Sequence, residues 1–215
     1  MTHLLQLKMV LDGTKPPIWR RILIDDSFTF ADLHSVIQIL MNWENCHLHD
    51  FDLGDDIKLM SDHDSLLDFK RNPIGSYKYF DATRVPLKNH LKKEGQTFLY
   101  TYDFGDNWGI VIKVEAIVPK QPNDKRVCCL AGKRNAPPED SGGVWGYADA
   151  LKCLKSKKGR SYEELREWYG EDFDPEHFNL QEMKAALDPY NITKKVSARR
   201  VWQLDPKAKT ARSKE

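Results

Sequence analysis

The first part of the chain contains two stretches in which apolar and polar residues alternate. Leucine or methionine occupies every second position from residue 5 to residue 11, which is the period of a strand with one buried face. A second strand is expected over residues 18–24, because the pair Pro16-Pro17 before it cannot lie within a central strand. The turn signal Asp12-Gly13 separates the two stretches. We therefore predict an antiparallel hairpin with a long loop.

Helical spacing replaces this alternation at Thr29. Thr29 and Asp32 are spaced as a capping box, which predicts that a helix begins here. His34 lies beside the apolar stripe of this helix, where it is either a hydrogen-bonded residue at the core boundary or a ligand or acid–base group. The stripe itself consists of Leu33, Val36, Ile37 and Leu40.

The middle of the chain carries the clearest hairpin signal. Residues 98–103 and 108–115 alternate between apolar or aromatic and polar side chains, and a turn containing Gly105 joins them. Both arms are rich in β-branched and aromatic residues, as hairpin strands usually are. Alternation also predicts a short strand over residues 47–53.

The remaining elements give weaker signals. Residues 55–80 are polar and predict a long loop with one short helical turn, and a short strand is expected near Val85 and Leu87. Later helix starts are predicted near residue 145, at Ser161 with Glu164 three positions on, at Asp174-Pro175, and at Asn179 with Glu182.

The order of these elements predicts the fold class. Strands lie early and in the middle of the chain, with one helix after the first hairpin and further helices at the end. This order indicates an α+β fold: a mainly antiparallel sheet built on hairpins, with C-terminal helices packed on it. We expect residues 1–190 to form a single domain and residues 191–215 to form a basic, flexible tail.

Charge distinguishes this tail from the rest of the chain. Residues 191–215 hold eight basic and two acidic side chains, a net charge of +6, which leaves −5 for the remainder of a chain of net charge +1. Such asymmetry is typical of nucleic-acid-binding tails, although solvated chain ends are often charged without a function. The candidate nucleic-acid contacts are Lys194, Lys195, Arg199 and Arg200.

Several features predict a cytoplasmic protein without a membrane segment. No apolar run approaches the roughly 20 residues that a spanning helix needs, and the N-terminal residues lack the pattern of a secretory signal. The four cysteines include no Cys-x-x-Cys pair, which suits a reducing compartment.

Two acidic motifs form the core of the candidate site. The turn of the central hairpin holds Asp103 and Asp106 beside the large ring of Trp108, and a turn by itself needs no such pairing of carboxylates with rings. A second motif combines two prolines, Glu139, Asp140 and two glycines. Aspartates in turns commonly accept backbone hydrogen bonds, so a structural role is the alternative to a functional one.

Histidine and arginine residues are candidates to complete the site. His47 and His49 share one face of the expected strand, where they could bind one metal ion or form a polar sheet edge. Arg20 lies on the second predicted strand, and a buried arginine needs a partner, for which Asp103 is the candidate. The candidate functional cluster is Asp103, Asp106, Trp108, Glu139, Asp140, His34, His47 and Arg20.

The motifs and their order resemble the plasmid pRiA Orf-three-like family. The run IWRR at 18–21 is followed by TFADLHSVIQ at 29–38, YTYDFGDNW at 100–108, PPEDSGG at 137–143 and FDPEHFNL at 173–180. The resemblance covers about residues 4–187. It implies an α+β fold, occurrence on plasmids and insertion elements, and no established biochemical activity, although some members carry a resolvase label.

This chain departs from the family pattern at three positions. Many members have histidine where this chain has Ile110, and cysteine where it has Ala136 and Ser141. A cysteine–histidine zinc site would therefore lack ligands here. The carboxylates remain, and their oxygens suit a hard divalent cation such as magnesium or calcium.

Two better-known chemistries are excluded. The chain lacks the early nucleophilic serine and the clustered arginines or histidines of recombinases, without which phosphoryl transfer has no positioned cations. DFGD also occurs in kinases, but the glycine-rich loop and the His-Arg-Asp loop are missing.

The sequence leaves two candidate functions. The first is a non-catalytic, mobile-element-associated module that binds protein or nucleic acid, with stacking rings around Trp108. The second is a divalent-metal hydrolase that uses the carboxylates of the two acidic motifs, with His34 or His47 as acid or base. No cofactor is predicted beyond this candidate metal ion.

Overall fold

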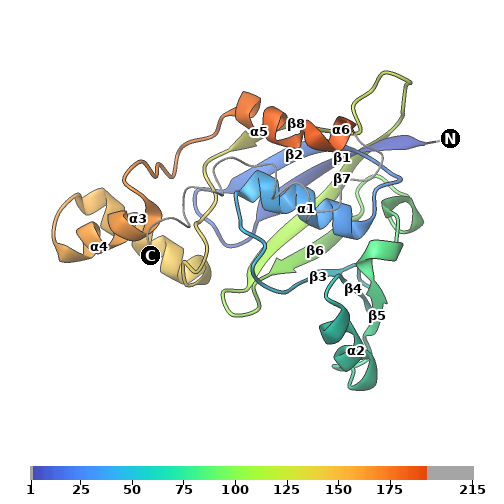
Figure 1. Cartoon of the computed structure of the whole chain (residues 1–215), viewed down its shortest axis with the longest axis horizontal. Helices are drawn as coiled ribbons and strands as arrows, with labels where there is room; N and C mark the ends of the chain where they lie inside the picture. The colour runs from blue at the N-terminus through green and yellow to red at the C-terminus, as the bar shows by residue number, and fades with distance from the viewer. Residues whose placement is uncertain (1, 193–215) are drawn as a thin grey trace.

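One eight-stranded sheet organises the structure, a computed structural model that describes residues 2–192 (Figure 1). The strand order is β5-β4-β3-β6-β7-β1-β2-β8. Neighbouring strands are antiparallel, except that β4 and β5 are parallel. The strands are β1 (His3–Leu11), β2 (Ile18–Asp25), β3 (His49–Asp52), β4 (Ile57–Met60), β5 (Lys78–Asp81), β6 (Thr97–Tyr102), β7 (Trp108–Pro119) and β8 (Val127–Lys133).

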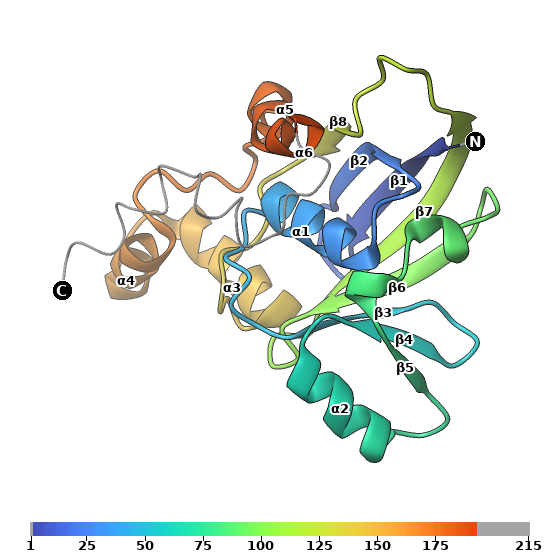
Figure 2. The same ribbon diagram turned by 45° about the vertical axis from the view of Figure 1, so that its right-hand side comes forward.

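The helices are unevenly distributed around this sheet. Helix α1 crosses one face, and α5 and α6 lie beside it towards β8 (Figures 1 and 2). Helix α2 lies at the β5 edge, while α3 and α4 lie beyond one end of the strands. The helices are α1 (Phe30–Met41), α2 (His63–Arg71), α3 (Gly143–Ser156), α4 (Arg160–Tyr169), α5 (Leu180–Leu187) and α6 (Pro189–Ile192), with short 3-10 turns at Ala82–Arg84 and Leu87–Asn89.

The α+β class with a largely antiparallel sheet is confirmed. Strands β1 and β2 form the first predicted hairpin, and β6 and β7 form the central one. The capping box at α1 is present in both directions, because Thr29 Oγ accepts from Asp32 N and Asp32 Oδ2 accepts from Thr29 N. Local patterns predicted these elements correctly because their buried faces and caps are encoded within a few residues.

The core lies between the sheet and α1. Leu5, Leu7 and Met9 of β1 are fully buried on this side, together with Leu33 and Ile37 of α1. The residues between them on β1 point to the other face of the sheet and are only half-buried. The alternation seen in the sequence therefore separates a covered face from a more open one.

The second half of the sheet was only partly predicted. Residues 55–80 form β4, α2 and β5 rather than a long loop. Strand β8 was missed, because its sequence VCCLAGK lacks a regular alternation. The expected strand near Val85 and Leu87 is wrong: Leu87 begins a 3-10 turn.

Two predicted helix starts are also wrong. Helix α4 begins at Arg160 after Gly159, so Ser161 lies inside the helix and does not cap it. Asp174 accepts a hydrogen bond from Glu176 N in a turn and starts no helix. Asn179 does cap α5, with its side chain accepting from the backbone amides of Gln181 and Glu182.

Some sequence-based expectations lie outside the described residues. These include the tail contacts Lys194, Lys195, Arg199 and Arg200 and the division into residues 1–190 and 191–215, which stays a prediction. Within residues 2–192, no helix combines the length and apolar character needed to cross a membrane.

Candidate functional site

The two acidic motifs meet in space. Asp106, in the turn between β6 and β7, accepts a hydrogen bond through Oδ2 from Gly142 N at 3.0 Å. A side chain at Gly143 would place its Cβ 2.5 Å from the backbone oxygen of Asp106, and one at Gly146 would reach 2.2 Å from that of Ser141. Only glycine allows such close approach. Gly143 therefore lets the second motif dock on the first, and Gly146 lets the chain pass close to Ser141 of the same loop.

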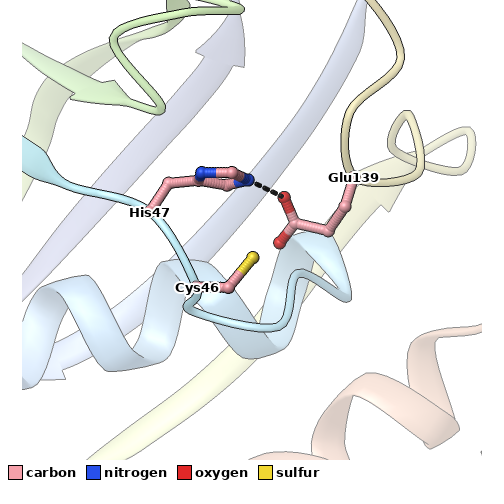
Figure 3. A group of neighbouring side chains, drawn as sticks. All are labelled: Cys46, His47 and Glu139. Carbon is pink, nitrogen blue, oxygen red and sulfur yellow. Dashed lines mark ion pairs between the residues drawn. The ribbon is translucent and has the colours of Figure 1, made fainter.

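His47 lies between these two motifs. It follows the end of α1, and its Nε2 is 3.1 Å from Asp140 Oδ1, 3.6 Å from Asp103 Oδ2 and 3.9 Å from Glu139 Oε2. Figure 3 shows its ring facing Glu139 across the gap between two chain segments, with Cys46 beside it. We call His47, Asp103, Glu139 and Asp140 the carboxylate–histidine cluster.

Backbone geometry holds the aspartates of this cluster in place. Asp103 and Asp140 both have φ of 54°, in the left-handed region that few non-glycine residues occupy. Asp103 Oδ1 accepts from Gly105 N at 2.9 Å, so its other oxygen is the one that faces His47. Such unusual conformations are concentrated at functional sites, where the surrounding structure maintains them.

Glu139 is oriented by two donors. Its Oε1 accepts from Tyr102 OH at 2.9 Å and from Glu44 N at 2.7 Å. Its Oε2 and His47 Nε2 are buried yet have no hydrogen-bond partner among the described residues. Burial raises the pKa of Glu139. Burial and the nearby Glu139 raise the pKa of Tyr102, so the tyrosine keeps the proton that it donates.

Stacked aromatic rings support the cluster from the core. The Trp43 ring stacks on Tyr102 with centroids 4.9 Å apart, and Trp108 lies 6.3 Å from Trp43. The Trp43 Nε1 donates to the backbone oxygen of Pro137 at 2.9 Å, which ties the second motif to this stack. Trp108 is completely buried, so its own ring supports the core and cannot stack on a ligand. In the stretch around it Phe104 is 43% exposed, and the expectation of stacking rings there stays a prediction.

A cavity of about 390 Å³ opens beside the cluster. Its polar side includes Glu44, Cys46, Glu139 and Asp140, and its aromatic side includes Trp168. Lysine and arginine are absent from the described residues that line it. An anionic ligand would therefore find no compensating charge in this cavity except from a bound cation.

Comparison with known proteins identifies the family. The sequence profile of the plasmid pRiA4b ORF-3-like proteins matches residues 3–182. The chain belongs to the plasmid pRiA4b ORF-3-like family. The site described above thus combines residues from the family motifs themselves.

Two relatives of this ORF-3-like chain have names that state no activity. An uncharacterized protein, y4hQ, from Sinorhizobium fredii (strain NBRC 101917 / NGR234) is 31% identical over 190 residues, which cover 87% of this chain and 92% of that protein. The crystal structure of MM3350, a protein of unknown function from Methanosarcina mazei Go1, matches with a TM-score of 0.72 and 37% identity, covering 85% of this chain and 98% of that one.

Arg20 takes no part in the cluster of this ORF-3-like protein. It is buried, and it donates to the backbone oxygens of Leu40, Trp19 and Lys133. Burial lowers the pKa of Arg20 to about 10. The expected pair between Arg20 and Asp103 is wrong, because three carbonyl groups serve as acceptors in place of a carboxylate.

His34 and His49 also lie apart from the cluster. Their rings are stacked with centroids 3.5 Å apart. His34 contacts Tyr100 OH at 2.8 Å and Asn45 Oδ1 at 2.7 Å, and His49 Nε2 contacts Ser61 Oγ at 3.2 Å. Among the histidines proposed from the sequence, only His47 is therefore brought to the carboxylates.

Sequence reasoning missed the roles of Tyr102 and Cys46. Alternation correctly placed Tyr102 on the buried face, but no local pattern shows that its hydroxyl reaches Glu139. Cys46 immediately precedes His47 and forms a second potential ligand group with His47 and Glu139. Burial raises the pKa of the Cys46 thiol, which favours the protonated form over the thiolate that metals bind.

Proposed function

We propose that this protein binds one divalent metal ion through His47, Asp103 and Asp140 and uses it to hydrolyse a substrate in the adjoining cavity. The observation that carries this proposal is the convergence of three donor atoms from three separate segments within 4.8 Å of one another. Two ligands about 2.1 Å from a tetrahedral ion lie roughly 3.4 Å apart. The separations of 3.1 and 3.6 Å from His47 Nε2 fit that geometry.

The donor set selects the kind of ion. Imidazole nitrogen favours zinc and its neighbours, whereas carboxylate oxygen is shared with manganese and magnesium. One nitrogen with two carboxylates therefore fits Zn²⁺ or Mn²⁺ better than Mg²⁺ or Ca²⁺. The sequence alone favoured the harder ions, because it did not place His47 beside the two motifs.

Three protein ligands leave open positions on the ion, as in catalytic sites. An ion held by these residues would lower the pKa of water bound at an open position and would so supply a nucleophile. Glu139, fixed by Tyr102 and Glu44 N, directs its free oxygen to the same space. Apart from the ion itself, the described residues that line the cavity include acidic but no basic side chains. We therefore propose a neutral or cationic substrate, with esters and amides as the classes to test.

A titration tests the metal site directly. Calorimetry with Zn²⁺ and Mn²⁺ should show one site per chain in the full-length protein, with at least about a 10-fold weaker affinity in His47→Ala, Asp103→Asn and Asp140→Asn. The matched controls are His177→Ala and Asp149→Asn, exposed residues outside the cluster. Unchanged binding in the cluster variants, or no binding in the wild-type protein, would contradict the proposal.

Turnover tests the reaction class. Neutral p-nitrophenyl esters should be hydrolysed faster with Zn²⁺ or Mn²⁺, and His47→Ala should remove this increase while His177→Ala keeps it. Metal binding without metal-dependent turnover of esters or amides would remove the hydrolase assignment and leave a metal-binding protein.

A second proposal is the non-catalytic interaction module. It is favoured by a different part of the molecule, the exposed face of the sheet, and the two proposals do not depend on each other.

A further inference from the structure

The face of the sheet opposite α1, here called the open face, carries an unusual surface. Its centre is formed by β6, β7, β1 and β2, which are neighbours in the sheet. Residues paired directly across these strands point to the same side. The strand register therefore shows which side chains lie next to one another on this face.

An apolar row crosses the open face. Trp19 pairs with Val10, Val10 pairs with Val111, and Val111 pairs with Leu99. Val111 is 40% exposed and Leu99 is 37% exposed. Contiguous apolar side chains in solvent commonly mark a binding surface.

A row of cations runs beside the apolar row. Arg21 pairs with Lys8, and Lys8 pairs with Lys113, across three adjacent strands. Glu115 forms an ion pair with Arg21, whereas Lys8 and Lys113 have no ion pair among residues 2–192. Like charges directly opposite each other are destabilising in an isolated sheet. Two lysines side by side without an ion pair fit an anionic partner.

Aromatic side chains lie among these groups. Lys8 Nζ is 5.7 Å and Arg21 Cζ is 5.4 Å from the Trp19 ring centroid. At the end of the open face, a cavity of about 610 Å³ lies between Leu99 and α3, where Trp145 is 85% exposed. A large apolar ring left so exposed is typical of a contact residue in binding sites.

We propose that the open face binds single-stranded nucleic acid. The phosphates would lie along Lys8 and Lys113, beside the Arg21–Glu115 ion pair, and the unpaired bases against Trp145 and the apolar row. This combination of a cationic track with stacking rings is how proteins bind single strands without sequence preference. An acidic peptide would satisfy the cations but would not use the exposed indole in the same way.

Fluorescence anisotropy with labelled oligo(dT) and oligo(U) of about 12 nucleotides tests this proposal in the full-length chain. Affinity should fall as salt rises from about 50 to about 200 mM. Lys8→Ala and Lys113→Ala should each reduce the slope of log affinity against log salt by about 0.7, the value for one lost phosphate contact on a single strand. Trp145→Ala should weaken binding about 5- to 150-fold with little change in slope.

Matched controls separate this face from other surfaces. Lys88→Ala, at an exposed lysine in a 3-10 turn outside the sheet, and Trp168→Ala, at a second exposed tryptophan of the described residues, should leave affinity and slope unchanged. Binding that is abolished by neutralising Lys194, Lys195, Arg199 and Arg200, yet unaffected by the open-face variants, would overturn the proposal. No salt-sensitive binding to either oligonucleotide, or equal binding to poly-glutamate, would overturn it as well.

Discussion

At the scale of single residues, the stacked pair His34–His49 has the clearest consequence. The rings lie 3.5 Å apart at an interplanar angle of 5° and are almost completely buried. Burial lowers the pKa of His34 to about 4. Burial and then the charge of His34 lower the pKa of His49 well below its usual value. Asn45 Oδ1 can only accept a hydrogen bond, so His34 donates to it from Nε2. The lowered pKa keeps the His34 ring neutral near pH 7.

Acid should therefore destabilise the fold through this pair. Both imidazoles bind fewer protons when folded than when unfolded, so their contribution to stability is complete above about pH 6.5 and is lost as pH falls below that value. For His34 the loss continues down to about pH 4. Urea unfolding between about pH 7 and about pH 5 should show the free energy of unfolding falling by up to about 1.4 kcal/mol per pH unit for each histidine.

A variant isolates this effect. His34→Gln keeps groups that can hydrogen-bond but cannot be protonated, so the free energy of unfolding should depend less steeply on pH. His177→Gln, at an exposed histidine, should retain the full dependence. An equal slope in the wild-type protein and His34→Gln would show that the pKa of His34 does not differ between the folded and unfolded states.

At the scale of elements, α1 and α4 differ in how they begin. Thr29 and Asp32 satisfy backbone donors of α1 reciprocally, whereas α4 follows Gly159 without a side-chain cap. Thr29→Ala should therefore lower the free energy of unfolding by about 1 kcal/mol. Ser161→Ala should change it by less than about 0.5 kcal/mol.

The same chemical denaturation experiment measures both variants. Ser161 is the matched control, because each hydroxyl residue has an acidic residue three positions later, yet only one of them caps a helix. A loss at Ser161 as large as that at Thr29 would contradict the observed start of α4.

These two helices also show how much of the fold could be predicted from the sequence. A capping box predicts a helix reliably only where an apolar stripe follows it, as at Thr29, and α4 has no buried side chain. The edge strand β5 and its neighbour β4 are short and partly exposed, so alternation scarcely distinguishes them from loops. The hairpin of β6 and β7 was predictable because strong alternation and its turn lie together in the chain.

The candidate site was predicted only in part for a related reason. Its residues lie in conspicuous motifs, so Asp103, Glu139 and Asp140 could be named. Their meeting depends on the docking of Gly142 and Gly143 against Asp106, which is a long-range contact without a local signature. Arg20 and His34 were included in the candidate functional cluster because the sequence does not distinguish a buried polar residue from a ligand-binding residue.

At the scale of the whole molecule, the carboxylate–histidine cluster joins segments that are far apart along the chain. His47 follows α1, Asp103 directly follows β6, and Asp140 precedes α3. These donors are brought together only when the complete fold forms. Metal binding at the cluster should therefore be coupled to the stability of the whole molecule.

A ligand that binds only the folded state stabilises it by mass action. With Zn²⁺ or Mn²⁺ at about 100 times its dissociation constant, the free energy of unfolding should rise by about 2.7 kcal/mol. Chelation with EDTA should reverse the increase, and His47→Ala should show none, while His177→Ala responds as the wild type. An equal increase in His47→Ala would place the ion elsewhere in the molecule.

The central position of β1 has a consequence for biosynthesis. This strand is synthesised before the other strands of the described sheet, and β2 can pair with it at once, but its other neighbour is β7, which follows much later in the chain. Until β7 has been synthesised, one edge of β1 has unpaired backbone groups next to the apolar side chains of the future core. The nascent chain therefore passes through a long interval in which an aggregation-prone edge is exposed, and chaperone protection during that interval suits this topology.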